Sequence, residues 1–115
     1  MLSMQNSLSA SLKYALTSYK KMQLLSKLVA GKQVDDALNT LEHTQKSAAK
    51  MLWKVVKSAK ANAVNNAWKD SSSLYIQHIL VGRGPKIKRM RFASRSRMHP
   101  YEKHRSFVKV ILNTK

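Results

Sequence analysis

The sequence has no cysteine, only five acidic residues, three glycines and two prolines among its 115 residues. The absence of cysteine excludes disulfide bonds, thiolate chemistry and cysteine-ligated zinc. No apolar run approaches the roughly 20 residues that cross a bilayer as a helix, so we expect no membrane insertion. A chain of this length has room for one domain with a modest core, which excludes a two-domain enzyme.

The scarcity of acidic residues leaves a formal net charge of +17, because 22 lysines and arginines oppose only five acids. Self-repulsion on this scale is unfavourable unless a polyanion neutralises it, so nucleic acid or an anionic membrane is implied. Residues 1–82 carry 11 Lys+Arg and 4 acids, whereas residues 83–115 carry 11 Lys+Arg and one acid. The last third of the chain is therefore the predicted polyanion-binding part.

Apolar spacing in the first two-thirds of the chain predicts helices. The first covers Tyr19–Ala30 and is followed by Gly31, where a left-handed C-terminal cap is expected. The second covers Val34–Leu41, and Asp35 and Asp36 in its first turn suit the positive end of the helix dipole.

A third, longer helix is predicted to begin at a Thr44 cap and to end near Ala63–Asn66. Its lysines lie opposite its apolar face, which is interpreted either as a solvated face or as an RNA-facing one. Trp53 falls among these lysines, and we favour packing against a neighbouring segment over base stacking for its ring. The lysines are Lys46, Lys50, Lys54, Lys57 and Lys60.

Beyond Ser73 the apolar pattern becomes that of strands, which are predicted at Leu74–Val81 and Ser106–Leu112. The 24 residues between them, Gly82–Arg105, are too many for an ordinary hairpin turn and too basic to be buried. We expect this segment to be disordered alone, or to be an extension held by another molecule. If the strands continue into it, the bend lies near Ala93–Ser96.

Nine lysines and arginines occur in this segment, a density suited to binding phosphates with an affinity that falls steeply with salt. Small and apolar residues such as Ile87, Met90 and Phe92 are interleaved with the cations. This mixture favours an arm inserted into folded RNA, where small side chains permit close approach and flat ones permit stacking.

Several blocks of the sequence resemble the large-subunit ribosomal protein 22 family, in the same order and spacing over residues 12–112. The hairpin of that family is similar to Gly84-Pro85-Lys86-Ile87-Lys88-Arg89, followed by Arg95-Ser96-Arg97 and Lys103-His104-Arg105-Ser106. The upstream helical blocks are similar to Ser18-Tyr19-Lys20-Lys21-Met22, Ala30-Gly31-Lys32-Gln33-Val34, Ala37-Leu38 and Ala59-Lys60-Ala61-Asn62-Ala63.

The resemblance implies an α+β fold in which three helices pack on a three-stranded antiparallel sheet with a long protruding β-hairpin. It divides the chain into an N-terminal extension, 1–11, and one domain, 12–115, whose hairpin arm covers about 82–105. It also implies assembly with large-subunit rRNA and neighbouring ribosomal proteins around the polypeptide exit tunnel, contact with the nascent chain, no homo-oligomer, no cofactor and no enzymatic activity.

Carried over by position, the resemblance implies two sets of site residues. The rRNA contacts are Lys20, Lys21, Arg83, Lys86, Lys88, Arg89, Arg91, Arg95, Arg97, Lys103 and Arg105. The tunnel-facing hairpin tip is Met90, Arg91, Phe92, Ala93, Ser94, Arg95 and Ser96. The tip departs from the usual bacterial pattern at Phe92, Ala93 and Ser96, which bears on the position of the bend. The blocks Lys88-Arg89-Met90-Arg91-Phe92 and Phe107-Val108-Lys109 resemble mitochondrial members of the family, and His99-Pro100-Tyr101 is not typical of bacterial ones, which favours a mitochondrial ribosome over a bacterial or plastid one.

Two other classes of function fit parts of the sequence. An architectural DNA-binding protein would clamp the minor groove with basic β-arms and use Phe92 or Pro100 as a wedge. A membrane-surface protein would lay the helix over 44–65 on anionic lipid. The four histidines lack the spacing of a helical metal pair, so no metal site is expected. Glu102 near His104 is interpreted as a local charge partner and not as catalytic machinery.

Overall fold

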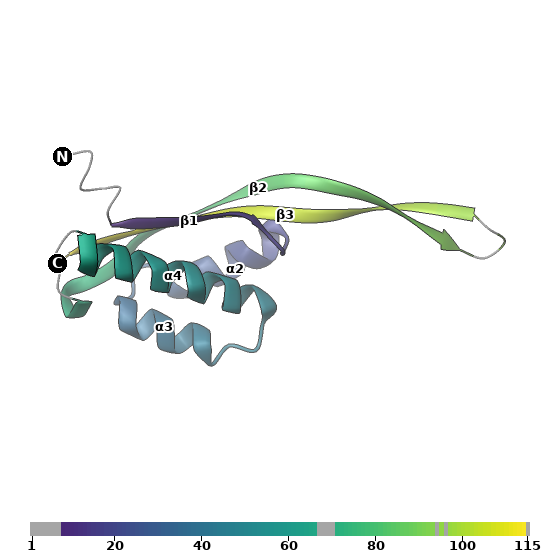
Figure 1. Ribbon diagram of the computed structural model, residues 1–115. Helices are drawn as coiled ribbons and strands as arrows, with labels where there is room; N and C mark the ends of the chain where they lie inside the picture. The colour runs from purple at the N-terminus through teal and green to yellow at the C-terminus, as the bar shows by residue number, and fades with distance from the viewer. Residues whose placement is uncertain (1–7, 67–70, 94, 96, 115) are drawn as a thin grey trace.

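Two long antiparallel strands are the largest elements of the protein. The computed structural model describes residues 8–66, 71–93, 95 and 97–114. Strand β2 (Leu74–Ala93) pairs with β3 (Arg97–Thr114), and the short β1 (Ser9–Ala15) pairs antiparallel with the other edge of β3. The sheet order is therefore β1-β3-β2. Figure 1 shows the three helices on one side of this sheet and the distal part of the β2–β3 hairpin extending beyond them.

The helices begin and end close to the predicted positions. They are α2 (Tyr19–Val29), α3 (Val34–Glu42) and α4 (Ser47–Asn66). Gly31 has a φ of 80°, which confirms the left-handed residue predicted after the first helix. Asp35 and Asp36 lie in the first turn of α3, as expected.

The predicted Thr44 cap is wrong. Helix α4 begins three residues later, at Ser47, and the Thr44 hydroxyl instead donates a hydrogen bond to the carbonyl of Thr40 at 2.7 Å. A threonine side chain bonds readily to a carbonyl four residues back, so Thr44 belongs to the end of α3.

The core lies between the helices and the sheet. Leu52 and Val56 of α4 are fully buried, as are Val108 and Val110 of β3. Because the apolar face of α4 packs into this core, it is not free to lie on lipid, and the membrane-surface interpretation of this helix is wrong. Within the described residues no helix is long and apolar enough to cross a membrane.

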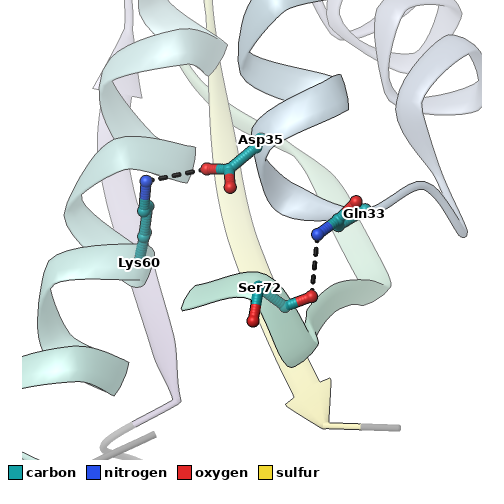
Figure 2. A network of polar contacts seen from close by, with 4 residues as sticks. All are labelled: Gln33, Asp35, Lys60 and Ser72. Carbon is teal, nitrogen blue, oxygen red and sulfur yellow. Dashed lines mark hydrogen bonds and ion pairs between the residues drawn. The ribbon is translucent and has the colours of Figure 1, made fainter. Parts of the chain in front are cut away.

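Polar contacts tie α3 to its neighbours, as Figure 2 shows. The Lys60 ammonium lies 2.7 Å from the Asp35 carboxylate, and the Gln33 amide donates a hydrogen bond of 2.7 Å to the carbonyl of Ser72 in the 3-10 turn η1 (Ser71–Ser73). Lys60 thus forms an ion pair within the fold. Lys46, Lys50, Lys54 and Lys57 are exposed, and Trp53 packs against the core, as favoured from the sequence.

The α+β class, with three helices on a three-stranded antiparallel sheet, is confirmed. Both predicted strands are present and extend far into the basic segment, which forms a paired hairpin within the chain. The strands end at Ala93 and begin again at Arg97, so the bend lies where it was expected. Arg95, between them, adopts a φ of 61°.

Ser106 is fully buried at the point where the arm leaves the sheet. Among the described side chains, its hydroxyl is the one buried polar atom without a hydrogen-bond partner. A buried hydroxyl that makes no hydrogen bond loses its hydration without compensation, which destabilises a fold by about 1–3 kcal/mol.

Replacing Ser106 with alanine should therefore raise the free energy of unfolding by about 1 kcal/mol, because it removes the unsatisfied hydroxyl and leaves the packing nearly unchanged. Thermal and urea unfolding of the purified protein measure the change. Ser11→Ala, at an exposed position of β1, is the matched control and should have little effect. A destabilised Ser106→Ala variant would show that the hydroxyl has a partner.

Candidate nucleic-acid interface

The hairpin β2–β3 carries nearly all of the predicted site residues. Arg83, Lys86, Lys88, Arg89 and Arg91 lie on β2, Arg97, Lys103 and Arg105 lie on β3, and Arg95 lies in the bend. All of these side chains are exposed except that of Arg105, which is half-buried. Of the predicted tip residues, Ser94 and Ser96 lie outside the described residues.

The distal part of the hairpin is long relative to the rest of the protein. The molecule measures 61 × 30 × 19 Å along its principal axes, and Figure 1 shows that the hairpin forms its long dimension. We call the part over 82–105 the arm. Because its backbone hydrogen bonds are made within the ladder, the arm presents its cations at a distance from the core without needing a partner chain to hold it.

The base of the arm brings α2 together with both strands. Lys20 lines a hollow with a volume of about 310 Å³ together with Arg83, Lys86 and Arg105. Lys21 lines a second one of about 440 Å³ with Lys103 and Arg105. The two lysines predicted from the helical block thus lie beside the predicted arm residues, although more than 60 residues separate them in the sequence.

The first turn of α2 contains no acidic residue, and its N-cap Ser18 makes no side-chain capping bond. The unpaired N–H groups and the dipole of a helix N-terminus favour anions. Together with Lys20 and Lys21 they make the base of the arm strongly electropositive. This is the chemistry that binds phosphate groups.

Aromatic rings support two of the arm cations, and neither contact was identified from the sequence. The Arg83 guanidinium lies 5.5 Å from the centroid of the Tyr19 ring, and that of Arg91 lies 5.1 Å from the Tyr101 ring. Such contacts orient a guanidinium while leaving its donors free for a ligand. Arg91 reaches Tyr101 diagonally across the ladder, because the register places Arg89 directly opposite Tyr101.

Glu102, the acidic residue of the arm, is a local charge partner, as expected from the sequence. The carboxylate of Glu102 lies 3.8 Å from the ammonium of Lys86, and both side chains are largely exposed. A surface pair of this kind contributes little stability. Its effect is to reduce the positive charge on one side of the arm.

The described residues contain no group of three or more potential metal ligands.

Fold and surface together define a class: a small, basic α+β protein that holds a long charged hairpin away from its core.

The comparisons with known proteins identify the family. Residues 10–113 match the family model described as ribosomal protein L22p/L17e. Large ribosomal subunit protein uL22 of Clostridioides difficile is 41% identical over 106 residues, which are 92% of this chain and 96% of that protein. The uL22 proteins of Syntrophus aciditrophicus and Metamycoplasma hominis are each 39% identical and cover 92% and 90% of this chain, and 96% and 80% of their own lengths.

The chain therefore belongs to the ribosomal protein L22p/L17e family. Membership makes it a structural constituent of the large ribosomal subunit and not an enzyme. The family resemblance expected from the sequence blocks is confirmed.

Gly84 lies where the backbones of the arm approach each other most closely. A Cβ atom added to Gly84 would lie 3.0 Å from the carbonyl oxygen of Arg105 and 3.1 Å from its carbonyl carbon. Backbone atoms cannot yield as a flexible side chain can, so any larger residue must displace the strand. At Gly82 the nearest atom would be 3.8 Å away, an ordinary contact.

Gly84→Ala should therefore destabilise the base of the arm by about 1–3 kcal/mol, the usual effect of overpacking. Hydrogen exchange of the amides in residues 86–103 should become faster, while exchange in the helices changes little. Gly82→Ala is the matched control and should leave exchange in the arm near that of the natural protein. Equal effects of the two substitutions would contradict the close approach at Gly84.

Proposed function

We propose that the protein binds large-subunit rRNA through the arm and its base, and that the arm extends along the polypeptide exit tunnel. The observation that carries the proposal is the placement of nine cations on a hairpin of paired strands that projects beyond the core. A long hairpin can enter folded RNA where a compact domain cannot. The proposed contacts are Lys20, Lys21, Arg83, Lys86, Lys88, Arg89, Arg91, Arg95, Arg97, Lys103 and Arg105.

The charge of the whole chain supports this proposal. A formal charge of +17 is compatible with a stable assembled state when many phosphates neutralise it, and each neutralised phosphate releases counterions. The tip, 90–96, would then face the tunnel and the nascent chain. One copy would assemble with rRNA and neighbouring large-subunit proteins, with no homo-oligomer, in support of subunit assembly and translation. We retain 1–11 as an N-terminal extension and 12–115 as the domain, although Ser9, Ala10 and Ser11 of that extension pair with β3.

Family membership favours rRNA over the architectural DNA-binding alternative. Sedimentation and a comparison of RNA with DNA binding distinguish the two proposals. A ribosomal protein should sediment as a monomer and prefer structured RNA to duplex DNA, whereas minor-groove proteins with basic arms bend duplex DNA.

Replacing Lys88, Arg89, Arg95 and Arg97 together with alanine should leave the protein folded, because none of these side chains is in the core. Incorporation into large subunits should fall by at least tenfold, since four phosphate contacts would be lost. Circular dichroism and thermal unfolding check the fold, and sucrose-gradient sedimentation of the tagged variant measures incorporation.

The matched control replaces four exposed lysines with alanine, Lys46 just before α4 and Lys50, Lys54 and Lys57 on it, which lowers the net charge by the same amount. If this control loses incorporation as strongly as the arm variant, total charge and not the arm determines binding. If the arm variant unfolds, the arm is part of the core and the proposed architecture fails.

We propose the mitochondrial ribosome as the location of the protein, on the ground of the sequence blocks 88–92, 99–101 and 107–109. The relatives described above are bacterial, which is also compatible with a bacterial ribosome. Cell fractionation distinguishes the two, because the endogenous protein should co-sediment with large subunits of the mitochondrial fraction. Co-sedimentation only with cytoplasmic or plastid subunits would contradict the proposal.

A further inference from the structure

The two faces of the β2–β3 hairpin differ in chemistry, and the cross-strand register assigns each residue to one of them. Side chains alternate between the faces along a strand, and residues directly opposite each other share a face. The even-numbered β3 residues Ser106, Val108, Val110 and Leu112 are buried under the helices. The odd-numbered residues of β3 therefore lie on the helix-free face, which we call the outer face.

The outer face is rich in cations and aromatic rings along most of β3. In sequence order its described side chains are Arg97, Tyr101, Lys103, Arg105, Phe107, Lys109 and Ile111. On β2 the register places Leu80 opposite Lys109, Gly82 opposite Phe107, Ile87 opposite Lys103 and Arg89 opposite Tyr101, and it places Arg91 opposite position 99.

The other side of the arm, which we call the inner face, is nearly neutral and partly apolar. It carries Lys86, Lys88 and Met90 on β2, opposite His104, Glu102 and Pro100 on β3. Glu102 pairs with Lys86, which leaves Lys88 as the one described cation without an acidic partner on this face between 86 and 103. Arg83, opposite Ser106 at the base of the arm, also lies on the inner face, over the Tyr19 ring. Met90 is 68% exposed. Over the arm from 86 to 103, the outer face instead carries Arg89, Arg91, Arg97 and Lys103.

The outer face continues past the arm onto the sheet, where no helix covers it, as Figure 1 shows. Phe107 and Lys109 follow Lys103 and Arg105 at the same two-residue spacing, and all four stand on one strand without an irregularity in β3. A hollow of about 410 Å³ on this part of the sheet is lined by Lys109 together with His78 and Ile111.

Gly82 leaves room above the Phe107 ring. The two residues are directly opposite, and a Cβ atom on Gly82 would lie 3.8 Å from Cδ1 of Phe107. Any side chain at Gly82 would therefore rest against this ring, whereas glycine leaves that side open. A half-buried aromatic ring beside cations is the arrangement on which unpaired bases stack.

We propose that the whole outer face, from Arg97 to Lys109, is one continuous rRNA-binding track in which Phe107 stacks on a base and the Tyr101 ring orients Arg91. Between 86 and 103, the inner face of the arm contributes less to binding than the outer face. The proposal rests on the proposed rRNA-binding function and deepens it, because it extends the binding surface onto the sheet body and separates the arm cations into two groups. Charge complementarity and continuity with the arm identify RNA as the occupant.

Two double variants of the arm test the division between faces. Arg89→Gln with Arg91→Gln removes two outer cations, and Lys86→Gln with Lys88→Gln removes two inner ones from the same strand, so both lower the net charge by two. Binding of the full chain to a large-subunit rRNA transcript is measured by filter binding at several salt concentrations. The outer variant should lower the salt slope by about 1.5, while the inner variant changes it by less than half as much.

The sheet body is tested first by two substitutions that leave the charge unchanged and then by one that removes a cation. Gly82→Val should fold normally, since valine suits a strand, and should weaken rRNA binding roughly tenfold by covering Phe107. Phe107→Leu keeps an apolar side chain and should weaken binding similarly. Lys109→Gln should lower the salt slope by about 0.7, and Lys54→Gln, on α4, is its control. Thermal unfolding of each variant confirms that the fold is retained.

The outcomes separate this proposal from the proposed function. If the inner and outer double variants lose affinity equally, the division between faces is wrong although rRNA binding stands. If Gly82→Val and Lys109→Gln bind rRNA fully but assemble poorly into subunits, the sheet body contacts a protein and the continuous track is wrong. If the natural protein shows no preference for the transcript over duplex DNA, the proposed function itself fails.

Discussion

The pairing of β2 with β3 is the constraint on which the rest of the molecule depends. The same ladder begins beside the core, between Leu74 and Thr114, and ends at the tip, between Ala93 and Arg97. In the body, helices bury one side of it, so hydrophobic contacts stabilise the pairing. In the arm the hydrogen bonds have no such cover, and the arm should therefore open locally more often than the body does.

The placement of the few acidic residues explains how so basic a chain keeps its charge where RNA can reach it. Asp35 pairs with Lys60 between α3 and α4, and Glu102 pairs with Lys86 at the base of the arm. Exposed pairs like these contribute little to the stability of the fold, but they determine which lysines have their charge neutralised within the chain. Most of the other described cations lie on α4, around the start of α2 and along the hairpin, where the phosphates of the proposed rRNA partner would relieve the repulsion between them.

Local patterns were sufficient to predict the helices and the buried parts of the long strands, because their apolar residues recur at a clear period. Thr44 was misassigned because a threonine can bond backward as well as cap forward. Strand β1 was not located from its residues, since it is short, carries few β-branched residues and contains an extra residue between Leu12 and Ala15. The sequence did not show that the strands continue through the arm. Cations stand on both faces there, so apolar and polar residues do not alternate.

The sequence also could not show which arm cations lie on the same face. This depends on a bulge, and only the observed pairing of the two strands reveals it. Between Arg83 and Lys86 on β2 there are three steps, while β3 takes two from Ser106 to His104. One extra residue in a strand reverses the face of every residue beyond it. Without that bulge, Arg89 and Arg91 would share a face with Glu102 and Pro100, and Lys88 would lie beside Tyr101. The bulge thus places Arg89 and Arg91 on the face where β3 already presents its aromatic and cationic side chains, while Arg83, before the bulge, lies on the other face. A single backbone irregularity therefore sorts the charge of the arm.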